Sequence, residues 1–263
     1  MAIVDSHVHV WRRHPLDEML AEMETAGVDK AIIIGAVNAD NPDNNEHIAE
    51  CVRDHPGTIA ALADIDIKAE DAQAKIEWAL EDLGLQGFSH YLSPDDPLDW
   101  FMDDAHSAMW SKAEQLGLTV SLSLYPNQHE VLRSLATAHP ALRIMLCHIA
   151  RPDHLEAPPF PKFQEVIRSA GCPNIYIKIS GFYAYTDRPW NFPYHEAQKW
   201  VRMVLDAYGP ERMCWGSDFS PVLNHSTYRQ SLEIVRSYCP FLSESDLEWV
   251  LGKAAMEAVS GEW

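Results

Sequence analysis

Lys30-Ala31-Ile32-Ile33-Ile34-Gly35 is the stretch of sequence that decides the fold class. It is a short run of almost entirely apolar residues, which is typical of a parallel strand that is buried on both faces. Amphipathic helices are predicted on either side of it, at Leu16–Ala26, where Gly27 ends the helix, and at Glu46–Asp54. A buried strand between two such helices indicates an α/β protein with a parallel sheet.

The same alternation continues along the chain. Eight strands are predicted, at Ile3–Val10, Lys30–Gly35, Thr58–Ile65, Leu85–Tyr91, Leu118–Leu124, Arg143–His148, Ile175–Ser180 and Met213–Gly216. The helices that follow them are predicted at Leu16–Ala26, Glu46–Asp54, Ala69–Leu83, Asp103–Leu116, Gln128–Ala138, Phe163–Ala170, Tyr194–Tyr208 and Thr227–Ser237. A last helix, Glu244–Val259, has Ser243 as its N-cap and no strand after it.

These repeats predict that residues 1–263 form a single (β/α)8 TIM barrel with an extra C-terminal helix. A doubly wound open sheet is the main alternative. The glycine fingerprint that such a fold carries after its first strand is absent from this sequence.

The composition bounds the class of protein and of partner. The chain has 263 residues, with 20 Lys and Arg against 39 Asp and Glu, and a net charge of −19. This charge argues against nucleic acid and anionic membranes, so a small-molecule partner is expected. No apolar run reaches the length of a membrane span, and no signal-peptide pattern is present. The five cysteines are scattered, as in reduced proteins, so a cytoplasmic location is predicted.

Two histidines lie on the first predicted strand, in Asp5-Ser6-His7-Val8-His9. Side chains alternate between the two faces of a strand, so His7 and His9 point the same way. Near the other end of the chain, Trp215-Gly216-Ser217-Asp218 closes the eighth strand with a carboxylate. A barrel makes its first and last strands neighbours, so these three side chains are expected in one pocket. Paired imidazoles can hold a divalent metal or stabilise an oxyanion, whereas an isolated pair can equally be structural.

Further polar residues lie where the other predicted strands end, which is the catalytic face of such a barrel. They are Asn38, Asp64, Asp66, Ser89, His90, Tyr125, His148, Lys178 and Ser180. Long aromatic loops at residues 151–162 and 182–195 follow strands six and seven on the same face, as the walls of a small-molecule pocket would. Substrate contacts are expected from guanidinium groups, which match a carboxylate, and from neighbouring polar side chains. These candidates are Arg12, Tyr125, Arg151, Lys178, Tyr183 and Arg188.

Four motifs occur in order along the chain. They are Asp-Ser-His-Val-His-Val-Trp at 5–11, Cys-His-Ile-Ala-Arg-Pro at 147–152, Ile-Lys-Ile-Ser-Gly-Phe at 177–182 and Trp-Gly-Ser-Asp-Phe-Ser at 215–220. Together they resemble the amidohydrolase superfamily, and more closely its amidohydrolase-2 branch. That branch includes sugar-lactone hydrolases, pyrone-dicarboxylate and muconolactone lactonases, and metal-dependent decarboxylases.

The resemblance implies roles for individual residues. Asp218 would be the general base that activates water, and His148 would take part in catalysis beside it. His90 is a further catalytic candidate, as a replacement for the Arg that related lactonases have at the position of Ser89. One divalent metal ion, Zn²⁺, would bind to His7, His9, His148 and Asp218, although some lactonases of the branch work without metal.

The chain also departs from its relatives. Binuclear members carry a bridging Lys or Glu on strand four and a His on strand five. Here strand four ends in Ser89-His90 and strand five has no histidine, so a two-metal site is not expected. Lactonases of the branch often have Arg where Ser89 stands, which implies different substrate recognition.

Three functions are compatible with this set of residues. The first is hydrolysis of a lactone or similar cyclic ester of a small carboxylated or sugar-acid substrate, with the oxyanion stabilised by metal or by the imidazoles directly. The second is metal-dependent decarboxylation of a small unsaturated or aromatic acid; the chain lacks the His-Gly-Gly-like turn after strand six that is associated with that subgroup. The third is a barrel that only binds a ligand. The sequence does not define the oligomeric state, although relatives are often dimers and a homodimer is compatible with it.

Overall fold

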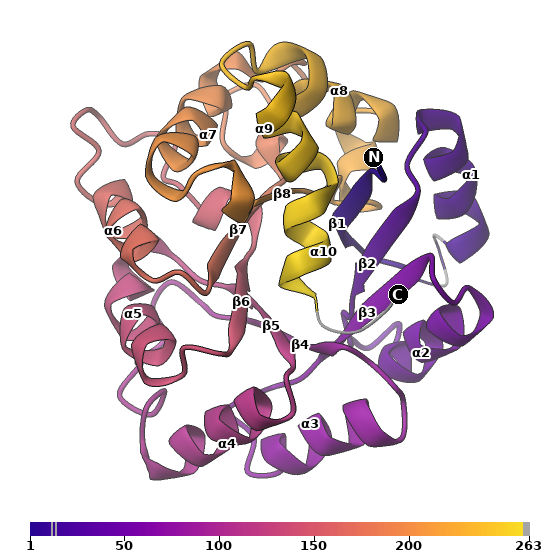
Figure 1. The fold of residues 1–263 in the computed structure, drawn as a ribbon, viewed down its shortest axis with the longest axis vertical. Helices are drawn as coiled ribbons and strands as arrows, with labels where there is room; N and C mark the ends of the chain where they lie inside the picture. The colour runs from indigo at the N-terminus through magenta and orange to yellow at the C-terminus, as the bar shows by residue number, and fades with distance from the viewer. Residues whose placement is uncertain (12, 14, 260–263) are drawn as a thin grey trace.

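A parallel sheet of eight strands in chain order forms the centre of the computed structural model, which describes residues 1–11, 13 and 15–259. The strands are β1 (Val4–Val8), β2 (Lys30–Ile34), β3 (Ile59–Asp64), β4 (Gly87–Tyr91), β5 (Thr119–Ser123), β6 (Arg143–Leu146), β7 (Ile175–Ile179) and β8 (Met213–Trp215). Figure 1 shows them as a ring inside the helices. The (β/α)8 barrel predicted from the alternation of strands and helices is therefore confirmed.

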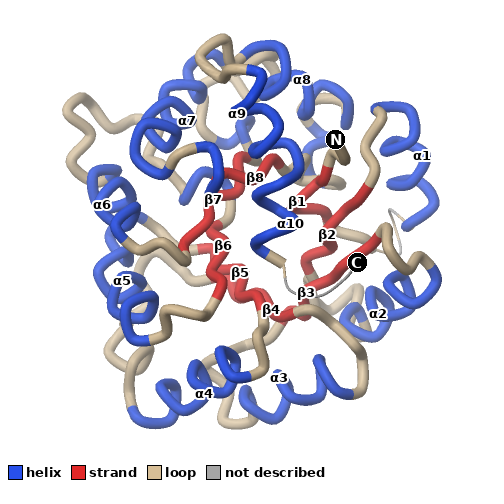
Figure 2. The backbone as a smooth tube through the Cα atoms, viewed as in Figure 1, coloured by secondary structure: helices blue, strands red, loops and turns tan. Residues whose placement is uncertain are grey.

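The helices form an outer layer around the strands (Figure 2). They are α1 (Leu16–Ala26), α2 (Asn44–Asp54), α3 (Ala72–Glu81), α4 (Asp104–Gln115), α5 (His129–Ala138), α6 (Phe163–Arg168), α7 (His195–Tyr208), α8 (Tyr228–Tyr238), α9 (Glu244–Glu248) and α10 (Ala254–Ala258). Their ends agree with the predicted bounds to within a few residues. Among the described residues, no helix has both the length and the apolar character needed to cross a bilayer.

Strand β2 is buried on both faces, as its composition predicted. Ile33 packs in the large apolar cluster that includes helix residues such as Met19 and Ile48. Ile32 and Ile34 belong to a second cluster inside the barrel, which also contains residues of α10. All three isoleucines have no exposed surface. Burial of both faces removes apolar area from water on each side of the sheet, which stabilises this closed arrangement.

The C-terminal segment covers one end of the barrel and leaves the other end for a site. A π-helical turn, Trp249–Lys253, joins α9 to α10, where the sequence predicted one regular helix. A side chain at Gly252 would collide with the carbonyl oxygen of Ala2, which explains why glycine stands at this close approach. The Thr119 hydroxyl, at the start of β5, donates to the carbonyl of Ala258. The N-terminal end of the barrel is thus closed, as α10 shows in Figure 1.

The two ends of the sheet meet at β1 and the segment after β8. Val8 and Phe219 form a parallel bridge, and the Asp218 amide donates to the His7 carbonyl at 2.9 Å. The Ser217 amide donates to Asp5 Oδ1 at 2.8 Å. The contacts that close the barrel therefore join the histidine-bearing segment directly to the segment that carries Asp218.

Candidate active site

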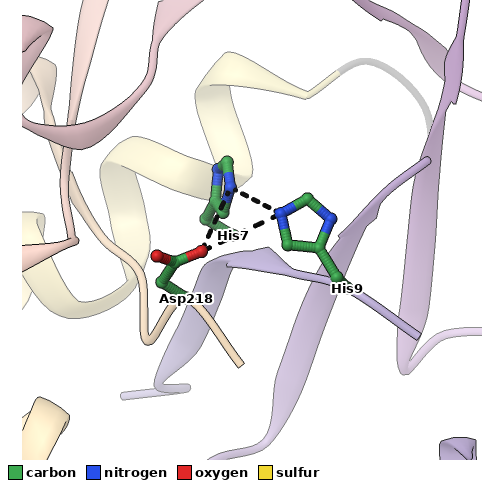
Figure 3. A group of neighbouring side chains, drawn as sticks. All are labelled: His7, His9 and Asp218. Atoms are coloured by element: carbon green, nitrogen blue, oxygen red, sulfur yellow. Dashed lines mark hydrogen bonds and ion pairs between the residues drawn. The ribbon is translucent and has the colours of Figure 1, made fainter. Parts of the chain in front are cut away.

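Three imidazoles and one carboxylate meet at the C-terminal end of the barrel. The Nε2 atoms of His7 and His9 are 3.2 Å apart, and they lie 3.7 and 3.8 Å from Asp218 Oδ1. Figure 3 shows these three side chains facing one another. His148 Nδ1 lies 4.0 Å from Asp218 Oδ2. The structure thus brings together four residues that are far apart in sequence.

The backbone around His148 has a conformation that residues other than glycine rarely adopt. The sequence predicted that β6 runs to His148, but the strand ends at Leu146. His148, Ile149, Ala150 and Arg151 follow with φ of 51° to 56°, in the left-handed region. Each such residue costs of the order of 1 kcal/mol, so the surrounding packing must impose the turn. The turn carries both a histidine and an arginine of the site.

Two glycines allow close approaches to the histidines. A side chain at Gly181 would lie 2.9 Å from His148 Nδ1, and Gly181 also has a φ of +68°. A side chain at Gly216 would lie 2.8 Å from the Cβ of His7. Larger residues at either position would displace a histidine of the site.

Burial sets the charge of the four groups. It lowers the pKa of His9 to about 4 and holds the pKa of His7 and of His148 well below 6.5, so the imidazoles are neutral at pH 7. Burial also raises the pKa of Asp218 from 3.8 to about 7. A carboxylate that titrates near neutrality beside neutral imidazoles is suited to take up a proton and return it.

Three further predicted residues touch this centre or its rim. The Tyr183 hydroxyl donates to Asp218 Oδ2 at 2.5 Å, and its ring stacks on His225 at 4.2 Å. Arg151 donates to Ser123 Oγ and to the Tyr125 hydroxyl, the latter at 2.9 Å. Tyr125 and Arg151 also line a cavity of about 450 Å³ at the rim.

The remaining predicted residues lie elsewhere. His90 lines a cavity of about 490 Å³ with Asp64 and Tyr91, and its Nδ1 lies 3.1 Å from the carbonyl of Ile65. Arg188 is exposed on the loop after β7. Arg12 lies outside the described residues.

Lys178, which was predicted to contact substrate, lies inside the barrel beside His7. It has no exposed surface, and its Nζ lies 2.7 Å from Ser121 Oγ and 3.3 Å from His7 Nδ1. The contact with His7 joins it to the candidate site.

Asp5 was quoted in the first motif but given no role. It is fully buried, and its Oδ1 accepts from the amides of His7 and Ser217 at 3.1 and 2.8 Å. Asp5, His7 and His9 are spaced two residues apart, and this period of two was the available signal that Asp5 belongs with them.

The metal prediction can be tested on the hydrogen bonding of the possible ligands. His7, His9 and Asp218 each offer one atom within 4.8 Å of the others, close enough to share one ion. A histidine that binds metal through Nε2 normally donates its Nδ1–H to an acceptor. His9 does so, because its Nδ1 lies 2.9 Å from the Ile34 carbonyl. The partner of His7 is of another kind: its Nδ1 lies 3.3 Å from Lys178 Nζ, an amine that carries hydrogens of its own. Proximity therefore fits a zinc ion, whereas the hydrogen bonding of His7 does not.

Comparison with known proteins bears on the family. The sequence model of the amidohydrolase family matches residues 4–259. Two relatives bear the name L-fucono-1,5-lactonase. The protein of Burkholderia ambifaria is 21% identical over 234 residues, which are 82% of this chain and 79% of the relative. The protein of Burkholderia multivorans is 23% identical over 266 residues, 89% of this chain and 88% of the relative.

Solved structures share the fold. An amidohydrolase of Burkholderia multivorans with bound zinc has a TM-score of 0.84 and 19% identity, over 98% of this chain and 99% of that one. A Pseudomonas putida protein provisionally named a 2-pyrone-4,6-dicarboxylic acid hydrolase has a TM-score of 0.80 and 20% identity, over 98% and 97%. The 5-carboxyvanillate decarboxylase of Sphingomonas paucimobilis has a TM-score of 0.65 and 15% identity, over 98% of both chains. Because the family match spans nearly the whole sequence, the chain belongs to the amidohydrolase family.

Proposed function

We propose that the chain hydrolyses a lactone or similar cyclic ester of a small carboxylated or sugar-acid molecule. The observation that carries the proposal is the Asp218 carboxylate, whose pKa of about 7 and position beside the Nε2 atoms of His7 and His9 suit a general base. The names of the two relatives and of the Pseudomonas putida neighbour support a lactone as the substrate class.

The reaction needs one proton to be moved twice. Asp218 Oδ1 takes a proton from water while the water oxygen attacks the lactone carbonyl carbon. The carbonyl oxygen becomes an oxyanion, which an imidazole N–H of the His7–His9 pair stabilises by hydrogen bonding. When the ring C–O bond breaks, the leaving alkoxide takes the proton back from Asp218. The product is the open hydroxy acid, and Asp218 returns to its starting state.

Binding groups lie on one side of this centre. Arg151 is held by Ser123 and Tyr125 beside a cavity of about 450 Å³, where a guanidinium can pair with a carboxylate or a ring hydroxyl of the substrate. Arg151 is the strongest of the predicted substrate contacts, because it lies on the same turn as His148 and two hydrogen bonds hold its guanidinium.

Acid release from a panel of sugar-acid and dicarboxylate lactones, followed with a pH indicator, tests the function. We expect release by the wild-type protein at rates far above spontaneous hydrolysis, and equal rates before and after treatment with a chelator. Loss of activity on chelation would contradict oxyanion stabilisation by the imidazoles alone. No release from any lactone would contradict the function itself, and the next assay would be CO₂ release from unsaturated and aromatic acids.

The rate is expected to depend on pH through Asp218. The base must be ionised, so kcat/KM should rise with pH and level off above the Asp218 pKa of about 7. The hydrogen bond from Tyr183 lowers this pKa, so Tyr183→Phe should move the rise to higher pH. The measurement is kcat/KM between pH 5 and about 9.

A matched control for that pH profile is Tyr194→Phe. Tyr194 is a buried tyrosine of the same loop whose hydroxyl donates to the carbonyl of His225 at 3.4 Å. Its removal should leave the position of the rise unchanged. If Tyr183→Phe gave the wild-type profile as well, Tyr183 would not act on the base.

A further inference from the structure

A lysine without exposed surface lies beneath the site and has no part in the mechanism described above. Lys178, on β7, reaches Ser121 Oγ on β5 at 2.7 Å and His7 Nδ1 on β1 at 3.3 Å. Burying an amine is costly, because the group must be compensated for the water that it loses. Both of its partners lie inside the barrel, and one of them is a residue of the proposed reaction centre.

The direction of the hydrogen bonds can be worked out from a carbonyl that can only accept. His9 Nδ1 lies 2.9 Å from the Ile34 carbonyl, so Nδ1 carries the proton of this ring. A neutral imidazole carries a single ring hydrogen, which in His9 is the one on Nδ1. His9 Nε2 is therefore an acceptor.

The same reasoning passes from His9 to His7. The two Nε2 atoms are 3.2 Å apart, so a single hydrogen lies between them. Since His9 Nε2 accepts, that hydrogen belongs to His7 Nε2. By the same count of one hydrogen for each neutral ring, His7 Nδ1 has no hydrogen and accepts from Lys178 Nζ, which is 3.3 Å away. An amine has hydrogens for both Ser121 and His7 whichever protonation state it holds. The chain of donors thus runs from Lys178 through His7 and His9 to Ile34.

We propose that Lys178 is a positioning residue that keeps the proton of His7 on Nε2. This hydrogen bonds to His9 Nε2 in the free protein and turns to the oxyanion when substrate is bound, so His7 acts as a donor and does not bind a metal. This rests on the proposed lactone hydrolysis for its catalytic meaning, but the placement of the proton stands on the geometry alone. A metal on His7 Nε2 would need the proton on Nδ1, opposite the hydrogens of Lys178.

The placement of the proton can be measured without substrate. Long-range ¹H–¹⁵N correlation spectra of the metal-free wild-type protein should show His7 protonated on Nε2 and His9 protonated on Nδ1. In Lys178→Met, which keeps a similar volume but cannot donate, the signals of His7 should shift toward protonation on Nδ1. Ser121→Ala removes only the other partner of Lys178 and should leave the His7 signals as in the wild type.

Kinetics and zinc titration give two further readouts on the same proteins. Loss of one oxyanion donor typically costs about 10²-fold in kcat, so Lys178→Met should lose about that factor with little change in KM. Titration with ZnCl₂ should show about tenfold tighter binding by Lys178→Met than by the wild type, since His7 can then turn its proton to Nδ1.

Two results would overturn the proposal. One is a wild-type spectrum with His7 protonated on Nδ1, which needs no variant to fold. The other is a Lys178→Met protein with unchanged His7 signals. If the spectra are as expected but no lactone is hydrolysed, the function is wrong while the role of Lys178 in placing the proton stands.

Discussion

Asp218→Asn is expected to lower kcat for lactone hydrolysis by about three orders of magnitude, because a general base contributes on that scale. The amide has nearly the same shape as the carboxylate, and its oxygen can still accept from Tyr183. The fold should therefore be unchanged, and KM should change little. The measurement is acid release at saturating lactone, with the melting temperature of both proteins as the check on folding.

Asp64→Asn is the matched comparison for this variant. Asp64 ends β3, and burial raises its pKa to about 6, so it is the other strand-end carboxylate that could act as a base near neutrality. Its Oδ2 accepts from the Val37 amide, and it faces the cavity beside His90. Asp64→Asn should keep most of the wild-type kcat. If Asp218→Asn kept full activity and Asp64→Asn lost it, the general base would be Asp64 and not Asp218.

The fold could be predicted from the sequence because local signals and global packing agree. Helix α1 has the same bounds in the prediction and in the structure, because Gly27 takes a φ of 75° where the helix ends. The apolar sequence of strand β2 predicted burial on both faces, and the structure confirms it. Where a short-range signal was missing, the prediction was less accurate: nothing in residues 249–253 indicated a π-helical turn.

The meeting of His7, His9 and Asp218 could also be predicted, because it needs only strand alternation and barrel closure. The contacts that position these three side chains could not be predicted from the sequence. Residues 148–151 have no glycine or asparagine to announce a left-handed turn, which tertiary packing imposes. The bond from Tyr183 to Asp218 spans 35 residues, and that from Lys178 to His7 spans 171. Such contacts depend on the register of distant strands, about which the spacing of residues along a chain carries no information.

Asp5 connects the stability of the barrel to the geometry of this site. Its Oδ1 accepts from the amides of His7 and Ser217, so one buried oxygen joins the strand that bears the histidines to the segment that leads to Asp218. Asp5→Ala leaves both amides without an acceptor, at about 1–3 kcal/mol each, and removes buried volume. We expect the free energy of unfolding to fall by about 3–5 kcal/mol, with a loss of kcat because His7 is released.

Asp5→Asn keeps an oxygen that can accept from the amides of His7 and Ser217 but removes the carboxylate charge. The variant therefore measures the effect of the charge alone. Burial raises the pKa of Asp5 to about 6, against 3.8 in the unfolded chain, so between these values the folded state binds more protons. The contribution of Asp5 to stability is therefore present below pH 4 and falls as the pH rises to about 6, by about 3 kcal/mol. An asparagine cannot ionise, so Asp5→Asn should match the wild type near pH 4 and gain relative to it above pH 6. Denaturant unfolding at pH 4 and pH 8 measures the difference. A gap between the two proteins that did not change with pH would show that the pKa of Asp5 is not raised in the folded protein.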